Sequence, residues 1–125
     1  QHKLERSVFF LGKMKREEYV PFVSCCDLGI GSLAWERVGV KIASPLKSRE
    51  YICCGIPVVF NAFDIDLSNT SYGFEIDSKD SSILEFFSTY ENTKNILDKN
   101  SFTLFSLQVL DMKNKLKKIL KKINL

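Results

Sequence analysis

The sequence predicts an α/β domain built on a mainly parallel sheet, because short apolar runs alternate with helical patterns along the chain. The clearest run is Val58–Phe60, which contains no polar residue, as is typical of a strand covered on both faces. A chain of 125 residues, with 45% hydrophobic and 26% charged residues, matches one globular domain with its own core. We therefore treat residues 1–125 as a single domain.

The first predicted strand is Val8–Leu11, an apolar run bounded by Gly12. Gly12, Lys13 and Met14 follow at its carboxyl end, which is where ligands bind in open α/β sheets. These three residues are therefore candidates for contact with a ligand. The alternative is that they form an ordinary turn between a strand and a helix.

A helix is predicted over Arg16–Cys26, where several apolar residues lie close to one face. Pro21 interrupts this pattern, so either the helix kinks there or a second helix begins with Pro21 at its first position. The next strand is predicted over Asp27–Leu33. Its Gly29 and Gly31 leave room on one face for the close approach of backbone or ligand.

The segment Ala34–Ala43 joins this strand to the next helix, which is the usual place for a binding loop in an open sheet. Arg37 and Lys41 are candidates for contact with a phosphate or a sugar carboxylate. The alternative is that both charges are only solvated. Trp35 is either a stacking surface for a sugar or a packing anchor for the loop.

The helix that follows has both of its ends marked in the sequence. Ser44 is expected to cap it, because a serine hydroxyl accepts from an otherwise unpaired backbone N–H, and Pro45 suits its first position. Gly55 is expected to close it in a left-handed conformation, and Pro57 prevents its continuation. The strand Val58–Phe60 comes next.

The start of this helix carries the predicted chemistry. Its first turn presents unpaired N–H groups and the positive end of the helix dipole, which favour an anion such as phosphate. Lys47 adds a full charge there, and Glu50, one turn on, is able to accept hydrogen bonds from the vicinal diol of a ribose. The alternative is that Lys47 and Glu50 form an ordinary i,i+3 surface pair.

The sequence shows no pattern of metal ligands. The four cysteines form two adjacent pairs, Cys25–Cys26 and Cys53–Cys54, without the gap of a zinc or thioredoxin motif. We expect reduced thiols, mostly one buried per pair. Asp64 and Asp66 form an Asp-x-Asp in the polar stretch Asn61–Ser71, predicted to be a surface loop. They do not directly follow a strand, so we expect no metal site.

The rest of the chain is predicted to be mainly helical. The expected elements are an edge-like strand over Tyr72–Asp77, a helix from Asp80 or Ser81 to Tyr90, a helix around 91–99, and a last helical region over 101–123, which the pattern allows to be one long helix.

The basic charge is concentrated in the tail. Residues 111–125 contain six lysines and one aspartate, a net +5, which leaves −2 for the remainder of a chain whose net charge is +3. Apolar residues form a stripe along 111–123. The tail is therefore predicted either to lie on an anionic membrane surface or to pack as a terminal helix on a domain. No nucleic-acid partner is expected.

The run Ser44-Pro45-Leu46-Lys47-Ser48-Arg49-Glu50-Tyr51, with Cys54-Gly55-Ile56-Pro57-Val58-Val59, resembles the donor-site segment of family 4 (group 1) glycosyltransferases of the GT-B fold. Upstream, Phe10-Leu11-Gly12 and Asp27-Leu28-Gly29-Ile30-Gly31-Ser32-Leu33 are also similar to the C-terminal domain of that family. The similarity runs from about Val8 to Phe60 and continues weakly to about Asp77.

The resemblance implies a Rossmann-like, mainly parallel sheet flanked by helices, as in the latter part of a GT-B C-terminal domain. It implies that Glu50 holds the donor ribose, that Ser44, Leu46 and Lys47 lie against the diphosphate, and that the base lies near Gly12–Met14. One departure concerns a second Glu that the family often has eight positions before the first. Ile42 stands there, so the sugar-facing role of that Glu is not carried over.

The predicted function is therefore the donor-binding part of a cytoplasmic glycosyltransferase of polysaccharide assembly. Its donor would be a UDP- or GDP-sugar, with no permanently bound cofactor, and a separate N-terminal domain would bind the acceptor. In the alternative in which the tail lies on a membrane, it would place the protein on the inner face, whereas a packed terminal helix would not. The alternatives are a non-catalytic Rossmann-like or flavodoxin-like regulatory domain and a sugar-nucleotide epimerase. An open sheet edge is also expected to favour a homodimer of the chain by itself.

Overall fold

The computed structural model describes residues 6–77, 80–93, 101, 104–111, 116–118 and 120–121. Its elements, in chain order, are α1 (Arg16–Ser24), β1 (Gly29–Ile30), the 3-10 helix η1 (Glu36–Val38), α2 (Leu46–Cys53), β2 (Val58–Phe60), β3 (Gly73–Glu75), α3 (Asp80–Thr93) and the π-helix η3 (Ser106–Leu110).

The three strands form one parallel sheet in the order β1-β2-β3. Val58 of β2 is paired with Gly29 on one side and with Gly73 on the other. The predicted α/β class with a parallel sheet is confirmed, as is the position of the third strand at a sheet edge. The sheet is narrow, and β1 is shorter than the strand predicted over Asp27–Leu33.

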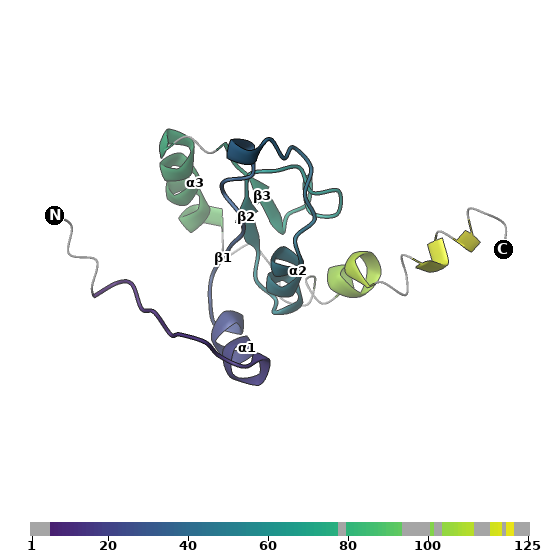
Figure 1. Ribbon diagram of the computed structural model, residues 1–125, viewed down its shortest axis with the longest axis horizontal. Helices are drawn as coiled ribbons and strands as arrows, with labels where there is room; N and C mark the ends of the chain where they lie inside the picture. The colour runs from purple at the N-terminus through teal and green to yellow at the C-terminus, as the bar shows by residue number, and fades with distance from the viewer. Residues whose placement is uncertain are drawn as a thin grey trace.

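Helices cover both faces of the sheet (Figure 1). On one face, Ile52 of α2 packs with Val58, Phe60 and Leu67 into a cluster of fully buried side chains. On the other face, the Phe74 ring lies against α3, 5.5 Å from the ring of Tyr90. These two layers bury every side chain of β2, which explains why its sequence is entirely apolar.

The two glycines of the second predicted strand allow α2 to approach the sheet closely. A Cβ atom at Gly29 would overlap the ring of Tyr51, and one at Gly31 would lie 2.9 Å from the carbonyl oxygen of Val59. Ser48 of α2 is also buried and lies above Gly31. The space that the glycines leave is therefore filled by α2 and by neighbouring backbone, and not by a ligand.

The segment Val8–Leu11 was predicted to be a buried strand, and this is wrong for the structure. Its four side chains are 45–95% exposed, and the segment belongs to no strand. Figure 1 shows it extending away from the sheet beyond α1. Apolar composition predicts a strand only where a partner strand is available, and here the segment is unpaired. Gly12–Met14 therefore do not follow the end of a strand.

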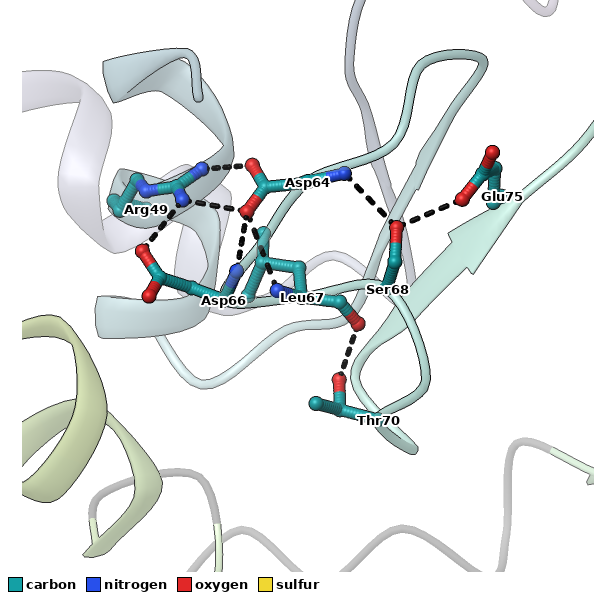
Figure 2. Close-up of polar contacts among 7 residues, drawn as sticks. All are labelled: Arg49, Asp64, Asp66, Leu67, Ser68, Thr70 and Glu75. Atoms are coloured by element: carbon teal, nitrogen blue, oxygen red, sulfur yellow. Dashed lines mark hydrogen bonds and ion pairs between the residues drawn. The ribbon is translucent and has the colours of Figure 1, made fainter. Parts of the chain in front are cut away.

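The connection between β2 and β3 was predicted to be a surface loop. It contains no helix or strand, as predicted, and Ile65 is 76% exposed, but part of it is buried. Leu67, Asp64 and Ser68 are buried in it. Arg49 of α2 binds both oxygens of Asp64, with Nη2 2.6 Å from Oδ1, and its Nη2 lies 2.8 Å from Asp66. Figure 2 shows this network continuing through Ser68 to Glu75 on β3. Its polar residues are buried because they satisfy one another.

Several helix ends also differ from the sequence prediction. Pro21 lies inside a single helix, α1, and does not start a second one. The last helical region is not continuous, because Asp111 is extended after η3, and residues 94–100 and much of 112–125 lie outside the described residues. The left-handed conformation of Gly55 after α2 is confirmed, with φ +79°.

The cysteine prediction is wrong in one respect. Cys25, Cys26 and Cys53 are exposed and Cys54 is half-buried, so no thiol is fully buried. The four thiols are free, as predicted. Although Cys53 is exposed as a residue, desolvation of its thiol raises the pKa of that group, which lowers its thiolate fraction at neutral pH.

The Arg49 network leads to a first testable prediction. Burial lowers the pKa of Arg49, but its hydrogen bonds to Asp64 and Asp66 outweigh this effect, so the pKa is raised and the guanidinium stays charged. Arg49→Ala leaves the buried Asp64 carboxylate uncompensated, and we expect a loss of about 3–5 kcal/mol in the free energy of unfolding, measured with urea. Arg37→Ala, at an exposed site on η1, is the matched control and should change it by less than about 0.5 kcal/mol. A loss below about 1 kcal/mol for Arg49→Ala would show that the network is not a major source of stability.

Candidate functional site

The amino end of α2 carries most of the predicted site residues. The N-cap is Pro45 and not Ser44, and no side chain caps the helix. The first backbone bond of the helix runs from the N–H of Ser48 to the carbonyl of Pro45, at 3.2 Å. In the part of the chain that the structure describes, the N–H groups of Leu46 and Lys47 have no partner. Both side chains are exposed, Leu46 by 85%, so these donors lie at an open surface.

Glu50 faces α1 and not Lys47. The Tyr19 hydroxyl donates a hydrogen bond to Glu50 Oε1, and Arg16 Nε lies 3.7 Å from the same oxygen. Among the described residues, Oε2 of Glu50 has no hydrogen-bond partner, and the side chain is 34% exposed. The i,i+3 pair with Lys47 is not formed. The carboxylate is thus held at one oxygen and open at the other.

The contact with Glu50 also changes the acidity of Tyr19. Its pKa is raised, first because its hydroxyl donates to Glu50, and further by burial and by the negative charge of that carboxylate. Arg16 acts in the opposite direction and is the weaker influence. The phenol therefore stays protonated at neutral pH and remains a donor to Glu50.

The other predicted site residues are not brought to this place. Arg37 lies on η1 with its side chain exposed, and Gly12, Lys13 and Met14 lie on the detached N-terminal segment. Lys41 is exposed and lies on the loop before α2, beside a short parallel bridge between Ile42 and Phe63. The site gathered by the structure therefore consists of the start of α2 and the facing residues of α1.

A second feature lies at the carboxyl ends of β2 and β3. An open cavity of about 600 Å³ is located there, and of the predicted site residues only Lys41 lines it. The other polar residues of its lining are Glu36, Asn61, Glu75 and Asp77. Sequence reasoning missed this cavity, because its walls come from three separate loops. It also missed Arg16 and Tyr19, although their i,i+3 spacing at the start of a predicted helix places them on one face.

Among the described residues there is neither a cluster of metal ligands nor a helix able to cross a membrane. Within the described ranges there is no group of three or more His, Cys, Asp or Glu residues that could hold a metal ion. Asp64 and Asp66 are both bound by Arg49. No helix in those ranges has the length and apolar character needed to cross a bilayer.

Comparison with known proteins does not assign the chain to a family. No family model, no curated protein and no solved structure matches the chain.

The Tyr19–Glu50 contact gives the second prediction. Because the native pKa is raised, the contact stabilises the fold at pH values below the unfolded-state pKa of about 10, and this stabilisation is lost as pH rises through the native pKa. Glu50→Gln removes the charge, so the pKa of Tyr19 should fall towards the ordinary value, as followed by the pH dependence of its NMR ring signals. Glu17→Gln, a change at an exposed position of α1, the helix that carries Tyr19, should leave the pKa of Tyr19 unchanged. An equal shift in both variants would contradict the assigned cause.

Proposed function

We propose that this chain is the donor-binding part of a glycosyltransferase and that it binds a nucleoside diphosphate sugar, either a UDP- or a GDP-sugar. The observation that carries the proposal is the arrangement on α2, where uncapped N–H groups at Leu46 and Lys47 lie one turn from a carboxylate with an open oxygen. The resemblance of Ser44–Val59 to the GT-B donor segment supports the same assignment and suggests the latter part of a GT-B C-terminal domain.

The start of α2 is suited to the diphosphate. Its N–H donors and the positive end of its dipole point to solvent beside Lys47, whose side chain is exposed. When the bond between the sugar and the diphosphate breaks, negative charge grows on the departing phosphate oxygens. Donors that are already oriented stabilise this charge without having to reorganise. Ser44 would contribute from the residue just before the N-cap.

Glu50 is suited to the ribose. The Tyr19 hydroxyl and the Arg16 guanidinium hold Oε1, so the orientation of the carboxylate is fixed before a ligand arrives. Oε2 then accepts from a ribose hydroxyl, a charge-assisted bond that is stronger than one between neutral groups. In this proposal Tyr19 and Arg16 act as positioning residues. The group that activates the acceptor hydroxyl would come from a separate acceptor-binding domain.

The test is a titration of the chain with UDP, GDP and their 2′,3′-dideoxy analogues, followed by backbone NMR shifts. A ribose role predicts that Glu50→Ala weakens binding of the ribonucleotide by about tenfold or more, the loss of one hydrogen bond to a charged group. The same variant should have little effect on the dideoxy analogue. Lys47→Gln should weaken both ligands alike, because it removes charge near the diphosphate.

The matched control is Glu17→Ala, which removes an acidic side chain from α1 without touching Glu50. Equal weakening of both ligands by Glu50→Ala would exclude the ribose role. If no nucleotide shifts residues 44–50, the donor-site proposal fails, and a non-catalytic interaction domain becomes the better description.

A further inference from the structure

The cavity at the carboxyl ends of β2 and β3 does not belong to the proposed donor site. Its volume of about 600 Å³ lies within the range of about 300–1,000 Å³ that is usual for small-molecule pockets. Among the described residues, its walls come from η1 and the loop after it, from the residues just after β2, and from the end of β3 and the residues after it. A ligand bound there would therefore use groups other than Lys47 and Glu50.

The charge of the cavity disfavours a phosphate. Of the described side chains that line it, Glu36, Glu75 and Asp77 are carboxylates and Lys41 is the one ammonium. Negative charges at close range repel one another, so a diphosphate would meet a net unfavourable field. The lining therefore suits a ligand that is neutral or cationic.

Asn61 contributes a hydrogen-bond donor that lacks an acceptor. The backbone N–H of Trp35 donates to Oδ1 of Asn61 at 3.2 Å, which identifies the other amide atom as the donor Nδ2. This Nδ2 is buried and has no partner within the described ranges. A buried donor without an acceptor costs free energy, and an oxygen atom bound in the cavity would supply one. A ligand with only cationic donor groups would not.

Glu75 contributes the complementary group, a charged acceptor. The Ser68 hydroxyl donates to its Oε2 at 2.7 Å, and among the described residues its Oε1 has no partner. A ligand that accepts from Asn61 and donates to Glu75 needs groups able to do both, which is the property of a hydroxyl. Phe63, which is 40% exposed, also lines the cavity and offers an apolar surface. Hydroxyl groups on a ring with apolar C–H faces are the features of a saccharide.

The backbone already holds these groups beside one another. Phe60, the residue before Asn61, is paired with Glu75 in the sheet. The N–H of Phe63 donates to the carbonyl of Lys41 at 3.0 Å. Because the three walls are connected before a ligand arrives, binding does not have to order the backbone, which lowers its entropic cost.

We propose that this cavity binds a saccharide through Lys41, Asn61 and Glu75, without any nucleotide. Glu75 Oε1 accepts from one hydroxyl of the sugar, and Asn61 Nδ2 and the Lys41 ammonium donate to others. The saccharide is separate from the sugar of the nucleotide donor, since the cavity disfavours the attached phosphates. In the donor-binding part of a glycosyltransferase, the cavity would hold part of the saccharide acceptor, and this last assignment alone rests on the proposed function.

The experiment is an NMR titration of the whole chain, without nucleotide, with the methyl glycosides of glucose, galactose and N-acetylglucosamine and with the disaccharides lactose and N,N′-diacetylchitobiose. At least one of these probes should shift the backbone signals of Lys41, Asn61 and Glu75 in a saturable manner. The signals of residues 46–50, at the start of α2, should not move with them.

Two nearly isosteric variants test the assigned contacts. Glu75→Gln keeps an acceptor oxygen for Ser68 and removes the free one, whereas Asn61→Asp keeps the acceptor for the Trp35 N–H and replaces the free donor by an acceptor. Each should weaken binding of the saccharide by about tenfold. Glu17→Gln, an exposed change on α1 outside the cavity, is the matched control and should leave the affinity unchanged.

Two lysine variants separate this site from the donor site. Lys41→Gln should weaken binding of the saccharide, and Lys47→Gln should not. For UDP the order is reversed, because Lys47 lies at the start of α2 and Lys41 lines the cavity. Failure of the saccharide site is thus distinguishable from failure of the proposed function.

Either of two results would overturn the proposal. If none of the five probes shifts residues 41, 61 and 75 at high millimolar concentration, the cavity is not a saccharide site. If these residues respond only to UDP- or GDP-sugars, and Lys47→Gln abolishes the response, the cavity serves the nucleotide-linked sugar and not a separate saccharide.

Discussion

The ion pair between Arg49 and Asp64 is the interaction on which the rest of the structure depends. Parallel neighbouring strands are usually joined through a helix, but β2 and β3 are joined by residues 61–72 without one. A network of charged and hydroxyl groups replaces the packing that a crossover helix would supply. Asp64 accepts from the backbone N–H of Leu67 as well as from Arg49, and Ser68 links the connection to Glu75 of β3. The Arg49 guanidinium thus links α2 to the connection that leads into β3.

The same helix carries the candidate site, and its residues point in three directions. Ser48 faces the sheet above Gly31, Arg49 faces the buried Asp64, and Glu50 faces α1. With two of these directions occupied by buried contacts, the rotation of α2 about its axis is fixed. The direction of Glu50 follows from that. A site on such a helix is therefore supported by residues that never touch a ligand, and Arg49 contributes to its geometry although it is unavailable for a phosphate.

Local signals in the sequence predicted the centre of the fold and missed its margins. Gly55 and the apolar run Val58–Phe60 were read correctly, because helix closure and full burial leave patterns within a few residues. Val8–Leu11 was misjudged because pairing depends on a distant strand. The burial of Asp64 within its loop was not predicted because its carboxylate is satisfied by Arg49, fifteen positions away. Glu50 was singled out from the sequence, whereas its partner Tyr19 was not, since the two residues lie 31 positions apart.

The helix-free connection between β2 and β3 also bears on the order in which the domain assembles. Val58 pairs with Gly73 across a short stretch of chain, whereas its pairing with Gly29 closes a loop about twice as long. The entropy lost on closing a loop grows with its length, so contacts between β2 and β3 form at the smaller entropic cost. α2 and the two strands after it are thus the natural folding nucleus. β1 and α1 would be added to a structure that already exists, and the N-terminal half would be the first to open.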